Sequence, residues 1–325
     1  MLDLDGDRLL FVETTRELLA SAPFVDGRSP IADGSAIEVR LSEALAASWA
    51  RPAPPDRYIF HVAYCGSTLL ATLLDCPSRS FALREPNILV DLANAKARFP
   101  ENRTDPPLTL ARALLRRRWQ AAEPALCKPS NWANNLVPEL TADPARIRPL
   151  FLATDQRTYL RAVMRGGRDR IESVLRTAEH LLEDAADRDP LWAAATARPA
   201  DATEVAARLA LVCLHRQFEL FEQAIERGGW NSRHLLTLAQ LEDDPVGACC
   251  LAAEALELDL PRSALKAAVA RRGAYYSKGP GQAYSPGDRR ARDEDVARAF
   301  GAAIDRALDW AAATGLKDRC GAALG

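Results

Sequence analysis

Long apolar runs are missing from this sequence, which nowhere approaches the roughly 20 consecutive apolar residues that a membrane-spanning helix needs. Lysine is also scarce, with five lysines among the 42 basic residues, and histidine occurs four times. The seven cysteines include no CxxC pair and no Cys/His spacing suited to zinc. We therefore expect no membrane span, no metal site and no disulfide framework, and we expect free thiols buried in a core.

The charges are nearly balanced, with 42 Lys and Arg against 44 Asp and Glu. A net charge of −2 gives no general attraction to nucleic acid or to an anionic membrane, so any anion site must be local. Residues 1–7 hold three aspartates and no basic residue, unlike the start of a signal peptide. These features predict a cytoplasmic protein without nucleic-acid or membrane partners, and they leave its oligomeric state open.

A length of 325 residues with 48% hydrophobic and 26% charged residues is typical of a globular protein with a large core. Residues 51–56 are rich in proline and cannot continue a helix. We therefore expect an extension over residues 1–56 that packs on a domain over residues 57–325. The domain carries a helical insert around residues 166–230.

Five short, nearly continuous apolar runs have the pattern of strands that are covered on both faces. They span residues 57–63, 80–83, 124–127, 149–153 and 234–238. Helical patterns separate or follow them at residues 69–74, 108–121, 158–164, 204–226 and 293–313, whereas 186–203 has the composition of a loose surface connection. This alternation predicts an α/β fold with a parallel sheet of about five strands and helices on both faces.

The stretch from Phe60 to Leu70 carries the clearest chemical signal. A buried strand that breaks at Gly66 and enters a helix at Ser67 and Thr68 presents backbone N–H groups and two hydroxyls, which suit phosphate or sulfate. An ordinary strand-to-helix turn with a Ser/Thr cap has the same residues. The Walker A pattern of P-loop nucleotide-binding proteins is absent.

Residues 64–70, Tyr-Cys-Gly-Ser-Thr-Leu-Leu, resemble the 5′-phosphosulfate loop of the sulfotransferase family. Three later segments are similar to that family in the same order. They are the Glu-Pro pair within Leu83–Pro86, the strand and helix of residues 149–164, and residues 238–245. The resemblance extends from about residue 57 to residue 290.

This resemblance implies a P-loop-type fold that binds 3′-phosphoadenosine 5′-phosphosulfate (PAPS) and transfers its sulfuryl group to a hydroxyl or amine of a small molecule or peptide. No metal is implied. Glu85 is the expected base for the acceptor, although a surface pairing with Arg84 would also explain it. The expected donor loop consists of Tyr64, Cys65, Gly66, Ser67 and Thr68.

The sequence departs from the family at positions that carry charge. Tyr64 stands where other members have Lys or Arg, while Thr154 and Ala162 stand where a 3′-phosphate Arg and Ser are expected. Lys128 directly follows the third expected strand, at the sheet edge where ligands of α/β folds bind. We therefore take Lys128 as a candidate catalytic residue that supplies the charge Tyr64 lacks.

Two further basic segments are candidates for the donor site. Arg157, Arg161 and Arg165 recur at every fourth residue, as on one helix face, where either a polyanion or solvent can accommodate them. In the later segment 271–289, Arg272, Ser277 and Lys278 match the family's late anion-binding loop, or belong to an ordinary surface loop. All six residues are predicted to bind the cofactor.

Two other functions remain open on the sequence. A small-molecule P-loop kinase would share the fold, but the Walker lysine and a clear magnesium-binding aspartate are missing. A catalytically silent module that binds a nucleotide or docks a partner would explain Tyr64 and Thr154.

Overall fold

The computed structural model describes residues 2–3, 8–28, 31–32, 34–48, 54–98, 105–120, 123–183, 185, 188–272, 286–316 and 318. At its centre lies a sheet of five parallel strands in the order β5-β6-β4-β7-β8. Every residue of β4, β6 and β8 is buried, which is why these strands are nearly continuous in apolar residues. The predicted α/β fold with a five-stranded parallel sheet is confirmed. The strands are β4 (Asp56–His61), β5 (Phe81–Arg84), β6 (Ala125–Lys128), β7 (Ile147–Ala153) and β8 (Leu235–Thr237).

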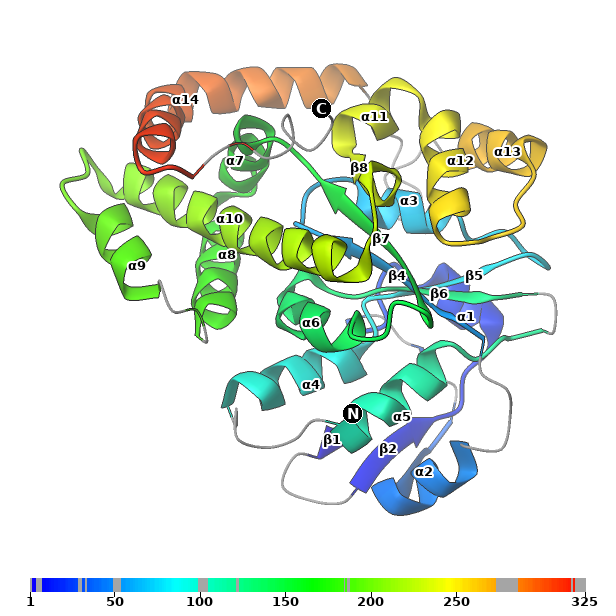
Figure 1. Ribbon diagram of the computed structural model, residues 1–325. Helices are drawn as coiled ribbons and strands as arrows, with labels where there is room; N and C mark the ends of the chain where they lie inside the picture. Colours follow the sequence, from blue (N-terminus) through cyan, green and yellow to red (C-terminus); the bar gives the residue numbers. More distant parts are fainter. Residues whose placement is uncertain are drawn as a thin grey trace.

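Helices lie on both sides of this sheet (Figure 1). On one side are α3 (Ser67–Leu73), α11 (Leu238–Asp243), α12 (Pro245–Ala255) and α13 (Arg262–Arg272). On the other are α4 (Asn87–Arg98), α5 (Asp105–Leu115), the 3₁₀ turn η1 (Asn131–Leu136), α6 (Val137–Leu140) and α10 (Ala202–Gly228). The remaining helical elements are α7 (Gln156–Arg165), α8 (Gly167–Leu182), α9 (Arg188–Thr196), the 3₁₀ turn η2 (Ser232–His234) and α14 (Pro286–Ala313).

Two expectations about helices are wrong. Residues 186–203 are not a loose connection, because they contain α9 and the first two residues of α10. Leu191 and Trp192 of α9 pack against the core, so tertiary contacts stabilise a helix that its Ala/Pro/Asp composition does not indicate. The helix expected at residues 108–121 is α5, which starts earlier and ends at Leu115. Within the described part of the chain, no helix is both long enough and apolar enough to cross a membrane.

The N-terminal residues form a small antiparallel sheet of β1 (Leu2–Asp3), β2 (Arg8–Val12) and β3 (Ala36–Arg40), in that order. Two short helices accompany it, α1 (Arg16–Ser21) and α2 (Leu41–Ser48). Helix α1 contacts β5, and α2 contacts α5. The N-terminal segment thus packs on the elements at the β5 edge of the parallel sheet.

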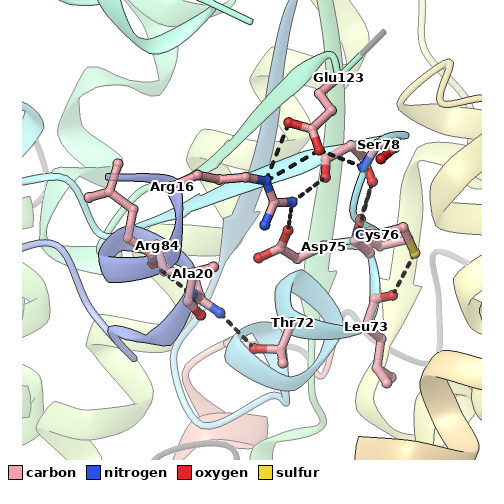
Figure 2. Close-up of polar contacts among 12 residues, drawn as sticks. Arg16, Ala20, Thr72, Leu73, Asp75, Cys76, Ser78, Arg84 and Glu123 are labelled. Carbon is pink, nitrogen blue, oxygen red and sulfur yellow. Dashed lines mark hydrogen bonds and ion pairs between the residues drawn. The ribbon is translucent and has the colours of Figure 1, made fainter. Parts of the chain in front are cut away.

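Buried ionic contacts anchor α1 to the sheet (Figure 2). Arg16 donates to Asp75, just after α3, at 3.0 Å and to Glu123, just before β6, at 3.3 Å. Both carboxylate side chains are only 1% exposed. Arg84 at the end of β5 donates to the carbonyl oxygens of Leu19 and Ala20, at 2.9 and 2.7 Å. One arginine from each side therefore holds the N-terminal segment in place.

Arg16→Met is expected to destabilise the protein by about 3–5 kcal/mol, because it leaves two buried carboxylates without their cation. Arg8→Met is the matched control, since Arg8 pairs with Glu38 on the surface and its side chain is 61% exposed. Its effect should stay below about 1 kcal/mol. Denaturant unfolding of both variants measures the difference. Equal stability of the two variants would contradict this account of the anchor.

Candidate functional site

Three polar side chains meet at the carboxyl edge of the neighbouring strands β4, β6 and β5. Lys128, the last residue of β6, is fully buried, and its Nζ donates to Oε1 of Glu85 at 2.6 Å. The same Nζ lies 2.9 Å from Nε2 of His61, the last residue of β4. The structure thus brings the two expected catalytic residues, Glu85 and Lys128, into direct contact. It adds His61, which was not among the candidate site residues.

Glu85 has a left-handed backbone conformation with φ 55°, which is uncommon for a residue other than glycine. Hydrogen bonds on three sides hold it there. Its N–H donates to the Lys128 carbonyl oxygen at 2.7 Å. On either side of it, Val25 donates to the Arg84 carbonyl oxygen at 2.7 Å and accepts from the N–H of Asn87 at 3.1 Å. The N-terminal segment therefore fixes the direction of the Glu85 side chain.

The second carboxylate oxygen of Glu85 binds a residue that the sequence did not indicate. Arg28 donates to Glu85 Oε2 at 2.9 Å, also pairs with Asp26, and lies over the Phe24 ring at 4.0 Å. The Arg28 side chain is 59% exposed, whereas that of Glu85 is 13% exposed. The contacts described for Arg84, the alternative partner of Glu85, go to the carbonyl oxygens of α1 and to Thr72.

His61 is fixed by contacts to both of its ring nitrogens. Nδ1 accepts from the N–H of Ala63 at 3.1 Å, and Nε2 lies 3.0 Å from the Pro129 carbonyl oxygen and 2.9 Å from Lys128 Nζ. Asn134 donates to the His61 carbonyl oxygen and to Gln217, both at 3.0 Å. These contacts give Asn134 the structural role expected for it and fix the end of β4 where the loop begins.

The loop after β4 turns sharply, with positive φ at Ala63, Tyr64 and Gly66. Ser67 and Thr68, at 5% and 4% exposure, begin α3. Among the described residues, the amides of Tyr64, Gly66 and Thr68 have no protein acceptor and the two hydroxyls have no hydrogen-bond partner, whereas the amides of Cys65 and Ser67 lie against the Cys65 sulfur. The predicted strand-to-helix turn is present.

Cys65 lies inside this turn, fully buried, with its Sγ 3.4 Å from the Leu152 carbonyl oxygen. Burial raises the pKa of the Cys65 thiol to about 11, against the lowering effect of nearby amides and of the Lys128 charge. The thiol is therefore protonated and fills space in the core. The six described cysteines are all free, and five of them are buried, in agreement with the sequence prediction.

Helix α11 covers the turn on the side of Gly66. A Cβ at Gly66 would lie 2.9 Å from Leu241 Cδ2 and 3.1 Å from Leu238 Cδ1, and φ at this residue is +81°. Glycine is needed here both for the backbone conformation and for the close approach of α11. The segment 238–245 thus shapes the loop by apolar packing.

The ring of Tyr64 contacts two other side chains, Tyr159 and Arg170. Its ring centroid lies 5.9 Å from that of Tyr159, and the Arg170 guanidinium of α8 lies over its ring at 4.8 Å. Burial raises the pKa of Tyr64 to about 12, and the positive charge of Arg170 acts in the opposite direction. The phenol is therefore protonated and able to donate a hydrogen bond. Sequence reasoning missed Arg170, because no motif surrounds it.

Two arginines of the α7 row pair with aspartates of α14. Arg157 pairs with Asp305 at 2.6 Å and Arg165 pairs with Asp293, both on α14. Arg161 makes no ion pair among the described residues. Local partners thus stabilise two of the three arginines, and the row needs no polyanion to explain it.

The other sequence candidates are placed only in part. Thr154 and Ala162, which replace the expected Arg and Ser, are buried at 2% and 4% exposure. Arg272 ends α13, but its side chain, like all of Ser277 and Lys278, lies outside the described residues. In the described ranges no group of three or more His, Cys, Asp or Glu side chains is arranged to hold a metal ion.

Comparison with known proteins gives no match to any protein-family model, to any curated protein or to any solved structure.

Gly66→Ala and Gly167→Ala form a matched pair that tests the packing of α11 on the loop. Both positions have positive φ, so each alanine is expected to cost about 1–2 kcal/mol of backbone strain. Nothing lies within 4 Å of a Cβ at Gly167, whereas Gly66→Ala meets Leu241 and Leu238 and should cost about 1–3 kcal/mol more. Chemical denaturation compares them, and an equal loss in both variants would rule out close contact between α11 and the loop.

Proposed function

We propose that this protein is a sulfotransferase that moves the sulfuryl group of PAPS to a hydroxyl or amine acceptor. One observation carries the proposal: a carboxylate held by a fully buried lysine lies at the same sheet edge as a turn in which three amides and two hydroxyls have no described protein acceptor. Open α/β sheets bind ligands at this edge. The resemblance of residues 64–70 and of the Glu-Pro pair to the sulfotransferase family supports the same reaction.

On the donor side, the loop supplies hydrogen bonds to a tetrahedral oxyanion. The amides of Tyr64, Gly66 and Thr68 and the hydroxyls of Ser67 and Thr68 suit the sulfuryl oxygens and the 5′-phosphate. The protonated phenol of Tyr64 can donate to the bridging oxygen as it leaves. Donors that are already fixed by the fold stabilise developing charge without reorganising during the reaction.

On the acceptor side, Glu85 takes the proton. Lys128 holds Oε1, and the exposed Arg28 holds Oε2, so an acceptor reaches Oε2 when Arg28 swings away. The acceptor oxygen or nitrogen forms a bond to sulfur, the bond from sulfur to the bridging oxygen breaks, and the acceptor proton passes to Glu85. The products are a sulfated acceptor and adenosine 3′,5′-bisphosphate. A small-molecule or peptide acceptor fits this scheme.

A catalytically silent binding module is the second candidate. It is favoured by the ion pairs of Arg157 and Arg165 with α14, which occupy arginines that were expected at the donor site.

We also propose a cytoplasmic location, supported by the buried free thiols, which persist in reducing compartments.

Ligand-induced stabilisation separates these functions. Adenosine 3′,5′-bisphosphate should stabilise the full chain by about 2.7 kcal/mol at a concentration of 100 times Kd, as measured by thermal unfolding, and ATP with magnesium should not. Stabilisation by ATP with magnesium alone would support the kinase instead. No stabilisation by either ligand would contradict a nucleotide site.

Glu85→Gln is the companion variant that separates catalysis from binding. Transfer of labelled sulfuryl groups from PAPS to a panel of phenols, alcohols and amines should fall by about 10²–10⁴-fold in this variant. Its stabilisation by the bisphosphate should stay unchanged. Binding without transfer in the wild-type protein would identify the silent module, and unchanged transfer in the variant would exclude Glu85 as the base.

A further inference from the structure

An oxyanion at the loop needs a positive charge, yet most nearby cations are already neutralised. Lys128 pairs with Glu85 at 2.6 Å, and Arg28 pairs with Glu85 and Asp26. The arginines at both ends of the α7 row pair with aspartates of α14. In the parts of the chain that the structure describes, neither Arg161 nor Arg170 has an acidic partner, and of the two it is Arg170 that contacts the loop residue Tyr64. Its charge therefore remains available.

Arg170 is also held against the loop. Its guanidinium carbon lies 4.8 Å from the centroid of the Tyr64 ring, and its Nη1 donates to the Ala162 carbonyl oxygen at 2.5 Å. A guanidinium over an aromatic face is attracted to the ring electrostatically. One hydrogen bond and one ring contact thus fix the direction of the group, while its other N–H donors have no described protein acceptor.

Gly166 leaves space for this side chain. A Cβ at Gly166 would lie 2.1 Å from Arg170 Nε and 2.4 Å from its Cδ. Any larger residue at this position would therefore displace the arginine side chain. The φ of −83° at Gly166 is one that any residue can adopt, so the backbone does not require glycine. Glycine is required at residue 166 because a larger side chain would occupy the space through which Arg170 passes between α7 and Tyr64.

We propose that Arg170 is the anion-binding cation of the 64–68 loop, with Tyr64 as the residue that positions it. The ligand class is a phosphate or sulfate oxyanion, and in the donor it is the 5′-phosphosulfate group. This inference rests on the proposed function and assigns the charge that residue 64 lacks. The two side chains together present a guanidinium and a phenol, both hydrogen-bond donors, to the oxyanion.

Calorimetric titration of the full chain with adenosine 3′,5′-bisphosphate and with inorganic pyrophosphate tests the proposal. Arg170→Met should weaken binding of the bisphosphate by at least about tenfold, the loss expected for one charged hydrogen bond. Arg168→Met is the matched control on the same helix, because Arg168 is 89% exposed and pairs with Glu172. Its affinity should equal that of the wild-type protein.

Two more variants keep the test decisive if Arg170→Met folds poorly. Gly166→Ala retains the arginine but displaces it, and Arg170→Lys retains a charge but loses the planar contact with Tyr64. Both should weaken binding in samples whose circular dichroism and unfolding temperature match those of the wild-type protein. Unchanged affinity in these folded variants would overturn the role of Arg170.

The failure of this inference differs from the failure of the proposed function. If the wild-type protein and Arg170→Met bind the bisphosphate equally well, the proposed donor site is retained and Arg170 is excluded as its anion-binding residue. Binding of pyrophosphate but not of the bisphosphate rejects the proposed donor, and the Arg170 variants then decide the anion role on pyrophosphate. A wild-type protein that binds neither anion overturns both proposals.

Discussion

The ion pair between Lys128 and Glu85 constrains the carboxyl edge of the sheet. The ammonium group of Lys128 is fully buried, and removing such an ion from water costs several kcal/mol unless a partner lies close by. Glu85 supplies that partner at 2.6 Å. To reach it, Glu85 adopts a left-handed backbone conformation, which Val25 maintains through hydrogen bonds to the residues around it. The N-terminal segment is in turn held by Arg16 and Arg84. A single buried charge thus connects the N-terminal segment to the site.

The same pair determines how charge is distributed in the candidate site. With Lys128 matched by Glu85, and Arg28 matched by Asp26 and Glu85, this cluster has little charge to offer a bound anion. Its role is to hold one carboxylate in a fixed direction. In the proposed site, the positive charge for the oxyanion is that of Arg170, which lies over Tyr64. We infer that the site separates the base from the anion-binding cation, so that neither neutralises the other.

The sequence predicted features that depend on local pattern. All five strands of the parallel sheet were expected, because buried strands are nearly continuous in apolar residues. Gly66 and Pro86 marked the turns after two of them. The position of Lys128 at the ligand-binding edge of the sheet was expected because it directly follows a predicted strand. The direct contact of Lys128 with Glu85 adds detail that strand direction alone does not give.

The features that sequence reasoning missed depend on contacts between distant residues. Arg28 lies 57 residues from Glu85, and the aspartates of α14 lie 128 and 148 residues from their arginines. Single charged residues carry no periodic signal, so nothing distinguishes Arg28 or Arg170 among 42 basic residues. Helix α9 was missed for a related reason, since packing of Leu191 and Trp192 on the core outweighs its composition.

The central claim is that Lys128 and Glu85 stabilise one another, and a double-mutant cycle in denaturant tests it most directly. Lys128→Met alone should cost about 3–5 kcal/mol, because it leaves Glu85 without its buried partner. Adding Glu85→Gln to it should recover part of that loss, with a coupling free energy above about 1 kcal/mol. Single-variant losses that simply add, or a Lys128→Met protein as stable as the wild type, would contradict the account.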